Sequence, residues 1–207
     1  MKVIYSILVL FILTSNNNSF AQKNSQLELG SIIPMSKELM INVNNEKMSL
    51  NNNFNENGLL VVFSCNTCPF VVMWEDRYRQ LEKMCHLNKV GMVYINSNEA
   101  KRNGDDSKEA MKNYAKSMGY TFPYLIDQNS TIANAFGAKT TPHIYLFDKN
   151  KKLVYKGAID DNFKDMSQVK ETYLLDAIQQ MISGEDIKIK ETNAKGCSIK
   201  REINSRN

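Results

Sequence analysis

Two cysteines stand close together in the segment Cys65-Asn66-Thr67-Cys68, directly after the apolar run Leu59–Phe63. At this spacing in the first turn of a helix, two sulfurs lie within bonding distance, so the pair can alternate between dithiol and disulfide. The free N–H groups and the positive dipole end of a helix start stabilise a thiolate. The segment therefore predicts a redox site, with Cys65 as the attacking thiol and Cys68 as the resolving one.

The elements around this pair alternate between strand and helix patterns. Leu59–Phe63 is apolar throughout, which predicts a central strand buried on both faces. After Pro69, which is tolerated only in a first helical turn, apolar residues recur at helical spacing as far as Cys85. Val90–Ile95 predicts the next strand, and a strand-helix-strand unit of this length implies a right-handed parallel crossover. The cysteine pair is therefore expected at the end of a parallel strand pair.

Further elements follow along the chain. Asp106 with Glu109 predicts the cap of a second helix, Ser130–Phe136 predicts a short third helix, and Ser167 predicts the start of a final helix ending at Gly184. Strand patterns occupy Leu39–Val43, Lys47–Leu50, Phe122–Ile126, His143–Phe147 and Lys152–Tyr155. The order of elements predicts one α/β domain with a mixed sheet.

The beginning of the chain has the features of a secretory signal peptide. Lys2 precedes the apolar run Val3–Leu13, and small residues stand at Ser19 and Ala21. A run of this length falls short of the roughly 20 residues that span a membrane, and no cysteine follows it for lipid attachment. We therefore expect cleavage after Ala21, no stable membrane anchor, and a secreted or periplasmic protein.

Charge is spread evenly along the chain. The net charge is +4, and acidic and basic residues are interleaved without a basic stripe. Proteins that bind nucleic acid usually carry such a stripe or patch. We therefore expect no nucleic-acid partner.

Taken together, the chain resembles the redoxin-type branch of the thioredoxin-like superfamily, within the alkyl hydroperoxide reductase and thiol-specific antioxidant group. The resemblance covers roughly residues 30–200 and rests on Cys65–Val71, Ile95–Asn98, Asp106-Ser107, Phe122–Leu125, Thr141-Pro142, Leu153–Tyr155, Asp160-Asp161 and Gly196–Lys200. It implies a thioredoxin-like fold, with a central mixed β-sheet flanked by helices and an N-terminal β-hairpin extension. It also implies thiol-disulfide chemistry at Cys65 and Cys68, without a cofactor.

The resemblance also suggests how the chain is divided. We expect a signal peptide over residues 1–21, a flexible start over 22–36, a thioredoxin-like redoxin domain over 37–184, and a tail over 185–207 that carries Cys197. In thioredoxin-like folds a cis-proline faces the cysteine pair, and Thr141-Pro142 stands at the matching place. A cis bond before proline costs only about 0.5–1 kcal/mol relative to trans. Thr141 and Pro142 are therefore the expected substrate-binding residues.

A dedicated peroxidase is not expected despite the group's name. Peroxiredoxins carry Pro-x-x-x-Thr/Ser-x-x-Cys around the peroxidatic cysteine. The matching positions before Cys65 are Val62 and Gly58, and those before Cys68 are Cys65 and Val61. Neither cysteine has the motif.

The predicted function is that of an exported thiol-disulfide oxidoreductase. Its partners would be disulfides or thiols of proteins or small molecules, together with an electron donor or acceptor that the sequence does not identify. The alternative is a copper-binding, metallochaperone-like protein that uses Cys65, Cys68 and His143, because thiolate and imidazole are copper ligands. A structural zinc site is not expected, since it normally needs four ligands and the chain has no second CxxC or HxxxH motif.

Two further cysteines have several possible roles. Cys85 lies on the apolar stripe of the first predicted helix, where we expect a small core residue. Cys197 in the tail is predicted to be a third redox thiol beside the CxxC pair, a disulfide partner of Cys85, or a free thiol. It cannot reach both places, because Cys68 and Cys85 are roughly 25 Å apart along a continuous helix.

Overall fold

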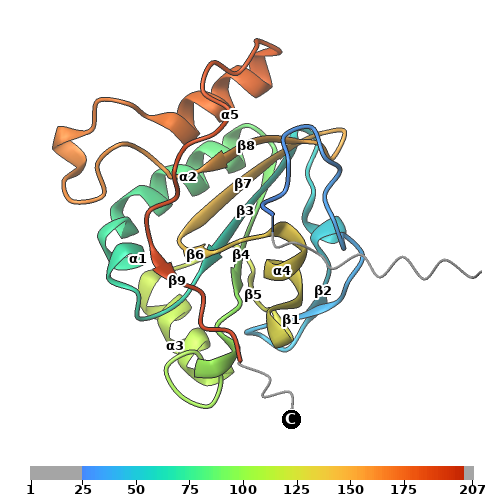
Figure 1. Ribbon diagram of the computed structural model, residues 1–207, viewed down its shortest axis with the longest axis vertical. Helices are drawn as coiled ribbons and strands as arrows, with labels where there is room; N and C mark the ends of the chain where they lie inside the picture. The colour runs from blue at the N-terminus through green and yellow to red at the C-terminus, as the bar shows by residue number, and fades with distance from the viewer. Residues whose placement is uncertain (1–24, 203–207) are drawn as a thin grey trace, which may run out of the picture.

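A seven-stranded mixed β-sheet runs through the computed structural model, which describes residues 25–202 (Figure 1). The strand order is β2-β1-β5-β4-β3-β7-β8, and a separate two-stranded sheet joins β6 to β9. The strands are β1 (Met40–Asn42), β2 (Lys47–Met48), β3 (Gly58–Ser64), β4 (Val90–Asn96), β5 (Tyr124–Ile126), β6 (Thr140–Thr141), β7 (His143–Asp148), β8 (Leu153–Gly157) and β9 (Cys197–Ser198). The predicted signal peptide lies outside the described residues.

The centre of the sheet is β3, every residue of which is buried. It runs parallel to β4 and antiparallel to β7, and β4 runs parallel to β5. Leu60 and Val62 face one apolar cluster and Leu59, Val61 and Phe63 face the other. The predicted two-sided burial, the parallel crossover and the β1–β2 hairpin are therefore confirmed.

Helices cover both faces of the sheet (Figure 1). Side chains of α2, α3 and α5 belong to the first apolar cluster, and those of α4 belong to the second. The helices are α1 (Pro69–Met73), α2 (Glu75–Leu87), α3 (Lys108–Met118), α4 (Thr131–Phe136) and α5 (Tyr173–Ser183). Within residues 25–202, no helix has the length and apolar character needed to cross a membrane.

The helix predicted as continuous after Pro69 is broken at Trp74. Its backbone angles there are φ −101° and ψ 6°, which separate α1 from α2. The Trp74 side chain is buried, and its Nε1 donates to Asp160 Oδ1 at 3.2 Å, while Arg77 Nε donates to Asp160 Oδ2 at 3.0 Å. The break is thus accompanied by a buried polar contact with the loop after β8.

Two predicted helix starts are wrong. Ser107, and not Asp106, caps α3, because its Oγ accepts from the backbone N–H of Ala110 at 3.2 Å. The final helix, α5, begins at Tyr173 rather than at Ser167, which lies in a short 3₁₀ turn whose cap is Asp165. Short polar side chains favour many local backbone contacts, so their type alone does not identify a helix start.

Both ends of the described chain pack against the fold. In the segment expected to be a flexible start, Leu27 N donates to Phe136 O at 2.9 Å and Gly30 N donates to Leu153 O at 2.8 Å. In the tail, β9 pairs with β6 (Figure 1), and Ile199 is buried. Packed contacts therefore extend on both sides of residues 37–184.

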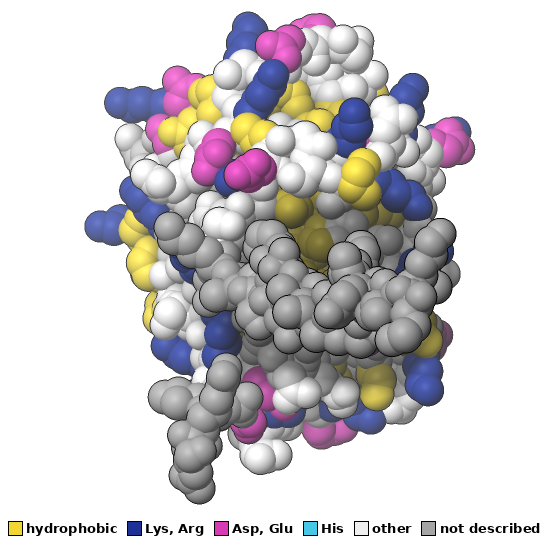
Figure 2. Space-filling model, turned by 45° about the vertical axis from the view of Figure 1, so that its right-hand side comes forward, with side chains coloured by type: hydrophobic (Ala, Val, Ile, Leu, Met, Phe, Trp, Pro, Cys, Tyr) yellow, Lys and Arg dark blue, Asp and Glu magenta, His cyan; other side chains and the backbone are white. Residues whose placement is uncertain are grey.

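Side-chain charge is mixed on the surface that Figure 2 draws. Basic and acidic side chains are interspersed over the described part of that face, without a continuous basic area. The arrangement agrees with the interleaved charges of the sequence.

Candidate active site

The cysteine pair lies where β3 ends and α1 begins. Cys65 is 2% exposed and Cys68 is 4% exposed. Cys68 is the N-cap of α1 and Pro69 occupies the first helical position. Proline is accommodated there because the first N–H groups of a helix have no partner within it. The sequence therefore fixes the helix start at the second cysteine, and both sulfurs lie beneath the surface.

The bond between Thr141 and Pro142 is cis, as predicted. Thr141 faces both cysteines: its Oγ1 lies 3.2 Å from Cys65 Sγ, and its carbonyl oxygen accepts from Cys68 Sγ at 3.0 Å. The structure therefore brings Cys65, Cys68, Thr141 and Pro142 together. The role of Thr141 and Pro142 in substrate binding stays a prediction.

The two thiols of the pair differ in acidity. The hydrogen bond from Cys65 lowers the pKa of Cys68 most, to about 4, and the Cys197 thiol and the N–H groups of Val71 and Cys197 lower it further. The pKa of Cys65 is raised by the same hydrogen bond, by burial and by the nearby Asp106 carboxylate. The thiol with the lower pKa is therefore Cys68, which donates to the Thr141 carbonyl oxygen while it carries its proton.

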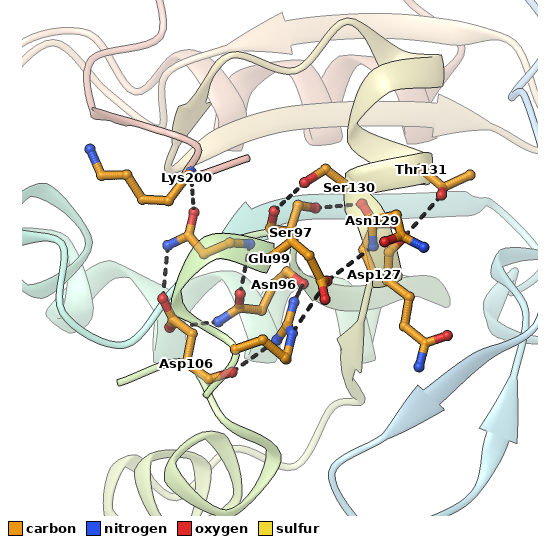
Figure 3. Close-up of polar contacts among 12 residues, drawn as sticks. Asn96, Ser97, Glu99, Asp106, Asp127, Asn129, Ser130, Thr131 and Lys200 are labelled. Carbon is orange, nitrogen blue, oxygen red and sulfur yellow. Dashed lines mark hydrogen bonds and ion pairs between the residues drawn. The ribbon is translucent and has the colours of Figure 1, made fainter. Parts of the chain in front are cut away.

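A buried carboxylate holds the loop between the two cysteines. Asp106 Oδ1 accepts from the Asn66 backbone N–H at 3.0 Å and from Asn96 Nδ2 at 2.7 Å. Asp106 Oδ2 accepts from Asn98 Nδ2 at 2.9 Å, and Asn98 Oδ1 in turn accepts from the Lys200 backbone N–H at 2.8 Å (Figure 3). Asp106 therefore links the CxxC loop to the end of β4, and Asn98 connects this group to the C-terminal segment.

Cys197 lies at this site and not beside Cys85. In the β6–β9 pairing Cys197 stands opposite Thr141, and its thiol and N–H act on Cys68. Cys85 is 1% exposed within the apolar cluster, where burial raises its pKa to about 12. The expectation that Cys85 is a core residue is confirmed, and all four cysteines are free thiols.

His143 is a packed residue of β7. It is 2% exposed, pairs with Phe63 across the sheet, and its Nδ1 accepts from the Lys139 N–H at 3.4 Å. Burial and the charges of Lys156 and Lys139 lower the pKa of His143 to about 3. Among the described residues, no three His, Cys, Asp or Glu side chains gather as metal ligands. His143 therefore does not join the cysteines in a copper site here.

The residues of the site that lie outside the predicted site set include Asp106, Asn98 and Gly196, whose missing side chain lets β9 approach Thr141. All three belong to segments that carry the family resemblance, and this was the available signal. Their roles depend on contacts between distant segments, such as the contact that joins Asn98 to Lys200. Periodicity in the sequence does not report such contacts.

Comparison with known proteins identifies the family of this chain. The Redoxin family model matches residues 28–172. The chain belongs to the Redoxin family. This family assignment and the thioredoxin-like fold make the chain a redox protein of the thioredoxin-like type. A search of curated proteins gave no match.

Solved structures similar to this Redoxin chain include redox proteins. An uncharacterized conserved protein from Geobacillus kaustophilus is 32% identical, with a TM-score of 0.79 over 86% of this chain and 94% of that one. A peroxidoxin from Mycobacterium tuberculosis is 14% identical (TM-score 0.58; 76% and 98% covered). The exposed lipoprotein thioredoxin of Streptococcus pneumoniae is 18% identical (TM-score 0.53; 71% and 98% covered). The last two likenesses concern the fold alone.

Proposed function

We propose that this chain is an exported thiol-disulfide oxidoreductase that works through Cys65 and Cys68. The observation that carries the proposal is that both sulfurs contact Thr141 beside a cis-proline, with the Cys68 thiol acidified to a pKa of about 4. A thiolate is the nucleophile in disulfide exchange. The pair therefore has a ready nucleophile and a second thiol next to it.

Cys68 makes the first attack in this proposal. Its thiolate attacks a partner disulfide, a Cys68–partner bond forms, and one partner sulfur leaves as a thiolate. Cys65 then gives up its proton and attacks Cys68, so that the Cys65–Cys68 bond forms and the second partner sulfur leaves with that proton. The order reverses the one expected from the sequence, and it is supported by the lowered pKa of Cys68, to which the contact with the Cys65 thiol contributes most.

The sequence pattern supports the proposed location and partner class, and one similar structure supports the location. The signal-peptide features of residues 1–21 support export, and one similar structure is named as an exposed lipoprotein thioredoxin. The absence of the peroxidatic motif around both cysteines supports disulfide exchange over peroxide reduction. Partners of this kind are protein or small-molecule disulfides and thiols.

An insulin reduction assay tests the proposal. With dithiothreitol as electron source, we expect the wild type to speed insulin reduction and Cys68→Ser to lower the rate at least about 100-fold, because the nucleophile is lost. Cys85→Ala is the matched control and should retain the wild-type rate. A wild type that does not accelerate the reaction, or a Cys68→Ser variant that does so fully, contradicts the proposal.

A trapping experiment tests the order of attack. Both variants carry Cys197→Ser, so that only the CxxC pair reacts. With Cys65→Ser we expect a stable mixed disulfide between Cys68 and a peptide disulfide, visible by mass spectrometry as added mass. With Cys68→Ser we expect no adduct. If the adduct forms on Cys65 instead, the order expected from the sequence holds.

A further inference from the structure

Three of the four cysteines meet at Thr141. Cys65 Sγ lies 3.2 Å from its Oγ1, Cys68 Sγ donates to its carbonyl oxygen at 3.0 Å, and Cys197 stands directly opposite it in the β6–β9 pairing. Opposite residues of an antiparallel pair have Cα atoms about 4.5–5.5 Å apart. The tail cysteine therefore belongs to the same site as the CxxC pair.

The strand that carries Cys197 is held on both sides of it. Before it, a Cβ on Gly196 would lie 2.3 Å from the carbonyl oxygen of Thr141, so only glycine allows this approach. After it, Ile199 N donates to Lys139 O at 2.9 Å, and Ile199 itself is buried. The position of Cys197 is thus built into the fold and does not depend on a loose end.

Exposure differs among the three thiols. Cys65 and Cys68 are almost completely covered, whereas Cys197 is half-buried. Strand β9 also occupies the edge beside Thr141 (Figure 1). An external sulfur therefore reaches Cys197 before it reaches the pair.

We propose that Cys197 is a third exchange thiol, which forms a reversible disulfide with Cys68 and passes electrons from external thiols to the CxxC pair; this rests on the function proposed above. From the oxidised pair, the Cys197 sulfur bonds to Cys68, the Cys65–Cys68 bond breaks, and Cys65 takes up the proton that Cys197 releases. The disulfide is then at the outer end of the site.

External thiols complete the reduction in two steps. A thiolate attacks Cys197, the Cys68–Cys197 bond breaks, and Cys68 leaves as a thiolate. A second external thiolate attacks the external sulfur of the mixed disulfide, and Cys197 leaves with a proton. Two electrons pass from two external thiols to the protein, and one external disulfide forms.

The acidity of Cys68 supports attack at Cys197. A thiol of low pKa leaves faster in disulfide exchange, and the pKa of Cys68 is lowered to about 4. The pKa of Cys197 is raised by burial and by contact with Cys68. Cleavage of a Cys68–Cys197 bond therefore favours Cys68 as the leaving sulfur.

Disulfide mapping tests the proposal directly. The reduced Cys65→Ser variant is oxidised with diamide, alkylated and digested with trypsin, which releases Cys197 on the peptide Gly196–Lys200. We expect this peptide to be linked to the one that carries Cys68. The Cys68→Ser variant should leave Cys197 alkylated, and Cys85→Ala should match the wild type. Circular dichroism checks folding, and Cys65→Ala provides a second variant of the same design.

A rate measurement gives a second criterion. We expect glutathione to reduce the oxidised Cys197→Ser variant at least about tenfold more slowly than the wild type, because the outer sulfur is missing. Two outcomes overturn the third-thiol proposal alone, provided that the wild type forms its Cys65–Cys68 disulfide. The first is an equal rate of reduction by glutathione for the wild type and Cys197→Ser. The second is an alkylated Cys197 in the oxidised Cys65→Ser variant. A wild type that forms no Cys65–Cys68 disulfide overturns the proposed function as well.

Discussion

Cys68 and Cys85 belong to the same apolar cluster and are both almost fully buried, at 4% and 1% exposed. Their acidities nevertheless move in opposite directions, since the pKa of Cys68 is lowered to about 4 and that of Cys85 is raised to about 12. Burial raises the pKa of both thiols. What differs is the supply of donors around the sulfur.

The supply of donors follows from the position of each cysteine in its helix. Cys68 precedes the first turn of α1, where the Val71 N–H has a free direction toward the sulfur, and the thiols of Cys65 and Cys197 add to it. Cys85 lies inside α2, where backbone N–H groups are used within the helix. Depth alone therefore does not make a cysteine inert or reactive.

The largest expected effect is a difference in alkylation. At pH 7 a thiol with a pKa of about 12 has a thiolate fraction of only about 10⁻⁵, whereas Cys68 is almost entirely ionised. We expect iodoacetamide to modify Cys68 in the folded, reduced protein at least about 100-fold faster than Cys85. Quantitative peptide mapping over time measures both rates, and urea-unfolded protein is the control in which the two rates should converge. Equal alkylation rates of Cys68 and Cys85 in the folded state would contradict the predicted difference in acidity between them.

The pH dependence of stability should differ in sign between the two cysteines. The folded pKa of Cys68 lies below the ordinary value of about 8.5, so its stabilisation is complete above that pH and disappears as the pH falls toward 4. The folded pKa of Cys85 lies above that value, so its contribution is complete below pH 8.5 and disappears as the pH rises toward 12.

Urea unfolding of the reduced protein measures this difference. The gap in unfolding free energy between the wild type and Cys68→Ala should narrow from pH 8.5 down to pH 5. The gap between the wild type and Cys85→Ala should narrow above pH 8.5. A Cys68→Ala gap that stays constant between pH 5 and 8.5 would show that Cys68 is not ionised in the folded state.

The sequence predicted the core position of Cys85, with a disulfide to Cys197 left open, and it predicted the reactive site in part. Cys85 lies on a regular apolar stripe, and such periodicity indicates core residues directly. The end of β3 also followed from a local pattern, whereas the cis-proline followed from the family resemblance. The sequence did not predict which sulfur of the pair has the lower pKa, because this depends on whether the helix begins at Cys65 or at Cys68.

The contacts that complete the site come from the tail. Strand β9 has only two residues, too few to give an alternating pattern, and its partner β6 is equally short. The Asp106 carboxylate was predicted as a helix cap because its neighbours in sequence suited that role, yet its partners come from the CxxC loop and the end of β4. Long-range pairing of polar groups is not encoded in any local period.

Removing the Asp106 carboxylate should weaken the contacts around the CxxC pair and leave those around Cys85 unchanged. Asp106→Asn replaces an acceptor of three hydrogen bonds from Asn66, Asn96 and Asn98, and we expect a loss of about 2–4 kcal/mol in unfolding free energy. Alkylation of Cys197 should become faster while that of Cys85 stays slow. The neighbouring Asp105→Asn, at an exposed side chain, is the control and should change stability by less than about 0.5 kcal/mol. Equal effects of the two substitutions would contradict the role of Asp106.

A smaller effect is expected from Gly196→Ala, which separates β9 from the pair without touching any sulfur. The added methyl group would meet the carbonyl oxygen of Thr141 at 2.3 Å, so β9 must shift, at a cost of about 1–3 kcal/mol. Gly104→Ala is the matched control, because its nearest neighbour would be 3.9 Å away. We expect faster alkylation of Cys197 and a higher Cys68 pKa in Gly196→Ala, measured from thiolate absorbance against pH, because the donors on Cys197 move away. An unchanged Cys68 pKa would mean that Cys65 and the helix start account for the difference from Cys85 without Cys197.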